Sequence, residues 1–353
     1  MSYTITSKLI NVEDWSEQNV ESWSQDVAIK NIWRPNAVNP QYLLIVKENE
    51  FIVIDKYGNK VLEKSVDYTI SYARINNNGE VIVASGAEIH VYSLDGSELF
   101  TASFANEVYK VVIGNEYFWV IEKTNPSTIY CYKMSDFSYT SFSYSLQSSG
   151  LIDLECSEDG YKAIATITTS APDVYVKVLS FDGELNSFKI ASTRAVTRDT
   201  MRIRPDATLG IVACGVTSGG TDYQNIYVVR SDGAYKAIDS RTVPDHTGYQ
   251  MAIDVNCEKM FFAVGETDTI YKRLIDIDTL EITDAGSFTI TENVESSGWI
   301  SSRFGDMTPD GNYILVHSAG KIFIIEWATQ IVKKEIVKSL SGARISMLAV
   351  EVT

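Results

Sequence analysis

The sequence predicts an all-β fold, a seven-bladed β-propeller, and three observations support this prediction. A strand pattern of aliphatic and aromatic residues recurs seven times along the chain, and helical periodicity is essentially absent. Each copy is followed by a turn, and several of these turns contain Asp-Gly, a strong hairpin signal because Gly accepts a positive φ. The turns lie 38 to 50 residues apart, which suits four short strands per unit.

The recurring strand is expected to be the third of each unit. Its copies are Phe51–Ile54, Ile89–Tyr92, Ile129–Tyr132, Val174–Val176, Ile226–Val229, Ile270–Tyr271 and Ile322–Ile325. An earlier strand in each unit is a largely apolar run, as expected of a strand covered on both faces. These runs are Tyr42–Val46, Val81–Ser85, Tyr117–Ile121, Lys162–Thr166, Gly210–Cys214, Phe261–Gly265 and Tyr313–His317. The domain organisation that follows is an N-terminal extension over residues 1–27 and a propeller over residues 28–353.

Closure of the ring admits two interpretations. A ring needs an inner strand for its first blade, because full closure removes exposed strand edges. We expect the C-terminal strand, Arg344–Val352, to fill this place. In the alternative, Val27–Trp33 fills it, and the tail joins Thr4–Ile10 in an eighth or incomplete blade.

These repeats resemble the WD-repeat and YVTN-type β-propellers, over roughly residues 28–353. The resemblance implies the fold alone, because the Gly-His and Trp-Asp dipeptides that define true WD repeats are missing. No functional residue is carried over from it.

Composition restricts the partners of this chain. The chain has 353 residues, 45% of them hydrophobic, and a net charge of −16, which disfavours nucleic acid and membrane surfaces as partners. The sequence contains no secretory signal and no apolar run of transmembrane length, so we expect synthesis in the cytoplasm. Its four cysteines are widely spaced, and its three histidines lack metal-ligand spacing, so we expect buried thiols and no cofactor.

The innermost strands are the place to look for a site, because they line the central channel. Counting five positions back from the third residue of the turn after each inner strand predicts a column of charged residues. The residue after each of these positions is apolar, as strand alternation requires. The column comprises Arg74, Glu155, Arg202, Asp254 and Asp306, with Val111 in the third unit and with Arg303 and Arg344 as further candidates. It would bind a small charged ligand or an ion, or its charges would neutralise one another and hold the blades in register.

A near-duplicate in the N-terminal extension places Trp15 and Trp23 eight residues apart in an acidic stretch. Trp is enriched at binding hot spots, so one interpretation is a docking segment for a partner protein. In the other interpretation, both rings cover the propeller's own rim or the mouth of its channel.

The function expected from these features is that of a non-enzymatic protein-binding scaffold, such as a structural component of a phage or virus particle. This expectation is an argument from fold alone. Two alternatives stay open: a small-ligand binder or lactone-hydrolase-like enzyme at the channel mouth, and a carbohydrate-binding propeller using loop aromatics such as Tyr223 and Tyr249.

Overall fold

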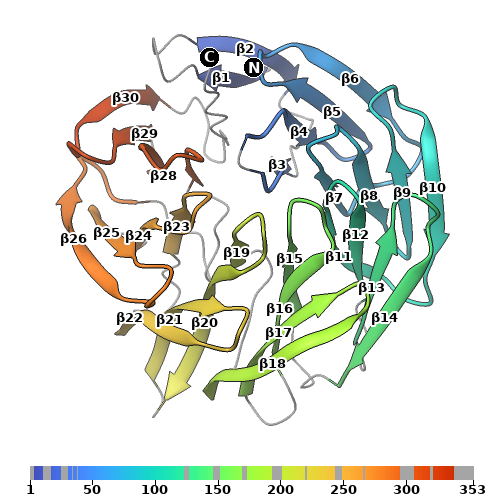
Figure 1. Ribbon diagram of the computed structural model, residues 1–353. Coiled ribbons are helices and arrows are strands. Elements are labelled where there is room, and N and C mark those ends of the chain that lie inside the picture. The colour runs from blue at the N-terminus through green and yellow to red at the C-terminus, as the bar shows by residue number, and fades with distance from the viewer. Residues whose placement is uncertain are drawn as a thin grey trace.

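The chain folds into a ring of seven four-stranded antiparallel sheets, as the computed structural model shows (Figure 1). The structure describes residues 4–10, 17–24, 31–33, 35–37, 39–122, 127–145, 152–168, 173–192, 201–218, 221–242, 249–264, 267–294, 306–318 and 321–337. Every regular element within these ranges is a β-strand. The seven-bladed propeller predicted from the repeats is therefore confirmed.

Blades one to three follow one another along the chain, and each begins with its innermost strand. The first comprises β3 (Asn31–Trp33), β4 (Tyr42–Val46), β5 (Glu50–Asp55) and β6 (Lys60–Ser65). The second comprises β7 (Tyr72–Ile75), β8 (Val81–Ser85), β9 (Glu88–Tyr92) and β10 (Glu98–Ser103). The third comprises β11 (Val108–Ile113), β12 (Tyr117–Glu122), β13 (Ser127–Lys133) and β14 (Tyr139–Tyr144).

Blades four to seven repeat the same order from the channel to the rim. The fourth comprises β15 (Ile152–Cys156), β16 (Lys162–Thr168), β17 (Asp173–Ser180) and β18 (Gly183–Ser192). The fifth comprises β19 (Met201–Ile203), β20 (Leu209–Ser218), β21 (Thr221–Arg230) and β22 (Tyr235–Thr242). The sixth comprises β23 (Tyr249–Ile253), β24 (Lys259–Val264), β25 (Thr269–Ile275) and β26 (Ile282–Thr289), and the seventh β27 (Asp306–Met307), β28 (Tyr313–His317), β29 (Lys321–Glu326) and β30 (Val332–Val337).

The expectation that the C-terminal strand completes the first blade is wrong. The inner position of that blade is held by β3, whose residues Asn31, Ile32 and Trp33 pair with Val46, Ile45 and Leu44. A segment directly preceding β4 reaches this position through a short connection, so the blade needs no strand from the far end of the chain. Residues 344–352 lie outside the described part of the structure.

A separate two-stranded sheet precedes the blades. Its strands, β1 (Thr4–Ile10) and β2 (Glu17–Ser24), pair antiparallel, with a register shift at Ser7 and Lys8. This hairpin lies at the edge of the ring, on the side where the first and last blades meet (Figure 1).

The apolar core is divided among the contacts between consecutive blades. The second strands are buried on both faces: in β8, Ile82 and Ala84 pack toward blade three, while Val81 and Val83 pack toward blade one. Strand alternation sends successive side chains to opposite faces, which explains why these strands read as continuous apolar runs.

The turns that follow the inner strands join the blades through polar contacts. Asn77 Oδ1 of blade two accepts a hydrogen bond from the backbone N–H of Gln41 at 2.8 Å. The backbone N–H of Asn77 donates to Asn115 Oδ1 at 3.1 Å. The N–H of Asn115 donates to the carbonyl of Glu158, whose N–H donates to the carbonyl of Pro205. This chain of hydrogen bonds links the first five blades and fixes the relative positions of their inner strands.

Candidate functional site

Four of the five charged residues predicted for the channel lie at equivalent positions on inner strands. Arg74, Glu155, Arg202 and Asp306 pair across to Ile82, Ile164, Ile211 and Leu315 on the second strands of their blades. Each lies two residues before the residue whose backbone N–H donates the hydrogen bond that closes the following turn. These four residues form one layer of the inner strands, which we define by their cross-strand pairing and not by their spacing in the sequence.

Asp254 does not belong to this layer. Its own N–H closes the turn after β23, and its carboxylate accepts the N–H groups of Glu258 and Lys259, both at 2.8 Å. Burial raises the pKa of this carboxyl group. The left-handed residue of this turn is Cys257 (φ 60°), so the turn lies two residues earlier than the counting assumed, and the count falls two residues late.

In the third blade, too, the residue predicted by counting is not the one at the equivalent position. Its turn is shorter, closing from Gly114 to Tyr117, so Val112 and not Val111 occupies the equivalent position. The charged residue of this blade is Lys110, which lies two residues before Val112 on the same face of the strand. Sequence counting missed Lys110, and the one available signal was a lysine inside the apolar run Val108–Ile113.

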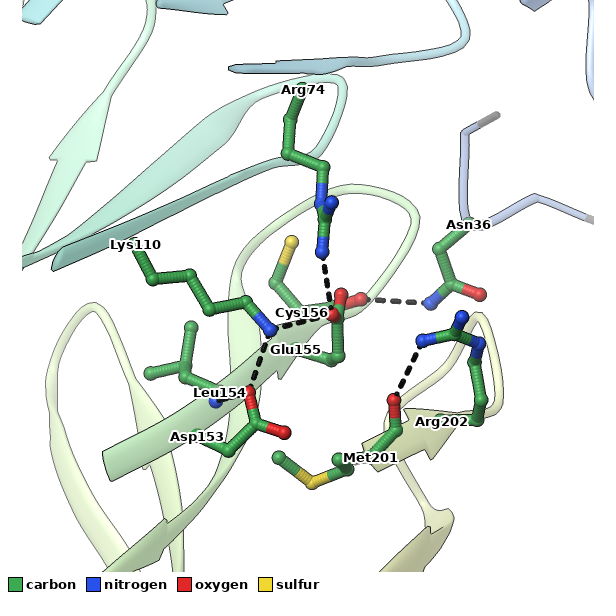
Figure 2. Close-up of polar contacts among 9 residues, drawn as sticks. All are labelled: Asn36, Arg74, Lys110, Asp153, Leu154, Glu155, Cys156, Met201 and Arg202. Carbon is green, nitrogen blue, oxygen red and sulfur yellow. Dashed lines mark hydrogen bonds and ion pairs between the residues drawn. The ribbon is translucent and has the colours of Figure 1, made fainter. Parts of the chain in front are cut away.

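Lys110 is the centre of an ion-pair cluster that joins three blades (Figure 2). Its ammonium lies 2.7 Å from Asp153 Oδ1 and 2.9 Å from Glu155 Oε1, both on β15 of blade four. Glu155 Oε1 is also 3.0 Å from Arg74 Nη2 of blade two. The Lys110 and Asp153 side chains are fully buried, and that of Glu155 is 13% exposed.

The cations of the cluster control the ionisation of Glu155. Burial alone would raise the pKa of this carboxyl group, because desolvation penalises the charged form. Lys110, Arg74 and Arg202 together outweigh burial and hold the pKa of Glu155 below its usual value of 4.5. The carboxylate is thus ionised at neutral pH and acts as the common counterion of three blades.

Two further groups border the cluster. Arg202 directs Nη1 to the carbonyl of Met201 at 3.0 Å, and Asn36 donates from Nδ2 to the carbonyl of Cys156 at 2.9 Å (Figure 2). Asn36 belongs to the segment before β4, so this bond links the first blade to the fourth. Asp306 lies on β27 of blade seven, and its carboxylate accepts the N–H of Met307 at 2.9 Å.

The remaining predicted residues lie in less completely described parts of the chain. Trp15, Arg303 and Arg344 are outside the described residues. Trp23 lies on β2 opposite Ile5, and the structure describes its backbone only. The same is true of Tyr223 on β21 and Tyr249 on β23.

Within the described ranges, no group of three or more His, Cys, Asp or Glu side chains is placed to hold a metal ion. Cys131, Cys156 and Cys257 are buried free thiols, and burial raises the pKa of all three. In the described part of the chain, no helix is long and apolar enough to cross a membrane.

The architecture and the register together define a WD-repeat-like β-propeller. Solved structures match nearly the whole chain. Hsv2 from Kluyveromyces marxianus matches with a TM-score of 0.61 and 10% identity, covering 88% of this chain and 99% of that one. A hydrazine synthase chain from Kuenenia stuttgartiensis matches with a TM-score of 0.58 and 12% identity, covering 86% and 97%.

A third similar structure is KlAtg21 in complex with the coiled coil of AgAtg16, with a TM-score of 0.59, 12% identity and coverage of 88% and 99%. At such identities these matches show the fold alone. A family model described as a family of unknown function (DUF5711) matches residues 15–130, which run from the N-terminal hairpin into the third blade. No curated protein sequence matches this chain.

Proposed function

We propose that this chain is a non-enzymatic scaffold whose rigid propeller binds other proteins. The observation that carries the proposal is the use of the inner charges. Lys110, Arg74 and Glu155 form ion pairs between blades, within the contacts that hold the ring in register. A charged layer used in this way favours a rigid support over a reactive centre.

Contacts elsewhere in the ring support the same role. Buried Gln250 of blade six donates to the carbonyl of His317 in blade seven at 2.7 Å and accepts its N–H at 2.9 Å. Trp119 of blade three donates to the carbonyl of Gly160 in blade four at 2.7 Å. Propellers of this fold occur in protein complexes, as with KlAtg21 and the coiled coil of AgAtg16, and in the mitotic checkpoint complex, whose match has a TM-score of 0.52.

The N-terminal hairpin is the proposed docking element. It forms a two-stranded sheet of its own outside the seven blades. A two-stranded hairpin has marginal stability by itself in water, so β1 and β2 need a surface to pack against. We propose that this surface, contacted through Trp15 and Trp23, is contributed by a partner protein.

The setting we propose for this scaffold is a large assembly such as a phage or virus particle, joined after synthesis in the cytoplasm. A net charge of −16 supports the solubility of such a component before assembly. Quantitative detection of the chain in purified particles tests this setting, and its absence from intact particles would exclude it.

The docking role is tested by native mass measurement of complexes formed in the source cells, using the full-length chain and a variant lacking residues 1–24. We expect the full-length chain to carry a partner in fixed stoichiometry and the truncated chain to lose it while its propeller keeps its thermal unfolding transition. Two equally stable monomers without a partner would contradict the proposed function.

A further inference from the structure

The outer strand of blade three differs from the other outer strands in lacking any charged residue. Its sequence is YTSFSY, over Tyr139–Tyr144. Each of the other six described outer strands, β6, β10, β18, β22, β26 and β30, contains at least one Asp, Glu, Lys or Arg. Outer strands are sheet edges, and natural proteins protect such edges with charges or proline. The edge of β14 has neither.

The backbone of this edge is suited to accept another strand. Within the described part of the chain, residues 139–144 pair with β13 on one side only, and β14 is the last strand of its sheet. In an antiparallel pair, every second residue directs its N–H and C=O away from the partner strand. The strand is extended without a register shift along its whole length, so these outward groups form a regular row.

The side chains beside the edge provide two different surfaces. Phe142 and Tyr144 are half-buried against blade four, where the Tyr144 hydroxyl donates to Glu184 at 2.9 Å. On the opposite face Ser141 and Ser143 are exposed, and the ring of Tyr139 is 59% exposed. An added strand would thus meet a small polar strip flanked by aromatic rings.

The aromatic rings continue from this strip toward blade two. Tyr139 lies 5.9 Å from Tyr130 between ring centroids, and Tyr130 lies 5.0 Å from Phe104. Phe137, in the turn before β14, has φ 55° and stacks on Phe100 at 4.2 Å. The turns of the same length in blades six and seven place Leu280 and Gln330 at this left-handed position.

We propose that the free edge of β14 binds an extended segment of a partner protein as a fifth strand of blade three. This inference rests on the proposed protein-binding function and assigns it a second surface. Backbone hydrogen bonds along the edge would provide affinity, and alternate side chains of the segment would contact the serine strip and the rings around Tyr139.

The occupant we infer is a neutral or basic segment of a different protein. The net charge of −16 repels acidic partners and also disfavours a second copy of this chain. An uncharged edge imposes no repulsion on a basic or neutral strand. Two copies would have to bring the same negative charge together across a short interface.

The test uses random linear peptides displayed on phage, selected against the full-length chain. The variant Ser141→Lys/Ser143→Lys introduces onto β14 the lysines that protect sheet edges elsewhere. The matched control is Ser287→Lys/Thr289→Lys, which adds the same charges at exposed positions of β26, an edge that already carries Asp284. Hydrogen exchange with and without each selected peptide locates the bound segment.

Selected peptides should be neutral or basic and should slow exchange of the β14 amides. Their affinity should fall by at least about tenfold for the β14 variant and remain unchanged for the control. Equal binding to both variants, or protection only at another surface, would overturn the inference. Protection at another surface would still agree with the proposed protein-binding function. Sedimentation that shows wild-type dimers and monomers of the β14 variant would instead identify a second copy as the occupant and overturn the inference.

Discussion

Replacing Lys110 with methionine tests whether the channel cluster is a structural ion-pair network. The change removes an ammonium that lies 2.7 Å from Asp153 and 2.9 Å from Glu155, with the Lys110 and Asp153 side chains fully buried. Deleting one partner of a buried pair leaves an uncompensated charge, so we expect Lys110→Met to lower the free energy of unfolding by about 3–5 kcal/mol. Urea denaturation followed by circular dichroism measures this loss as a lower midpoint at an unchanged slope.

A surface pair with the same geometry provides the control. Lys60 and Glu63 also lie 2.7 Å apart, but their side chains are 37% and 46% exposed. Solvent screening reduces such pairs to about 0–1 kcal/mol, so Lys60→Met should change stability little. Equal losses in the two variants, or a loss below about 1 kcal/mol for Lys110→Met, would refute the argument from burial.

The pH dependence provides a second readout on the same variant. The folded-state pKa of Glu155 lies below its usual value, so its stabilising contribution is complete above pH 4.5 and is lost as pH falls through the folded pKa. Lys110 makes the largest cationic contribution to that lowering. The pKa of Glu155 should therefore rise in Lys110→Met, and the stability difference between the two proteins should shrink below pH 4.5. A difference independent of pH would contradict this account.

Four further substitutions, one of them a control, test the blade contacts and turns, each by urea denaturation. Gly160→Ala places a Cβ 2.2 Å from a backbone oxygen at φ 82° and should lower the free energy of unfolding by at least about 2 kcal/mol. Gly86→Ala, with open space around it, should lower it only by the backbone strain of about 1–2 kcal/mol. Equal losses in the two variants would contradict the packing argument. Gln330→Gly removes a left-handed strain at φ 63° and should stabilise by roughly 0.5–1 kcal/mol, and a loss of stability would show that the side chain matters more. Gln250→Leu leaves two buried backbone groups of His317 without the hydrogen bonds that Gln250 makes to them and should cost about 2–4 kcal/mol; a neutral effect would show that other groups replace these bonds.

The sequence by itself determined the fold class and the number of blades. Apolar runs such as Val81–Ser85 and the turns at Gly58, Gly96 and Gly233 are local signals, because strand burial and positive φ are properties of a few consecutive residues. The same periodicity placed Arg74, Glu155 and Arg202 correctly on inner strands. In blade six the turn around Cys257 lies two residues earlier than the counting assumed, and Asp254 was misplaced.

The tertiary structure decided ring closure and the pairing of charges. Whether β3 or the tail completes the first blade depends on competition between segments far apart in the chain, which local pattern does not measure. Lys110 reaches Asp153 and Glu155 across a blade interface, more than forty residues along the chain. Only the packing of blade against blade sets such distances. The sequence thus specifies each blade, and the contacts between blades create the charged cluster.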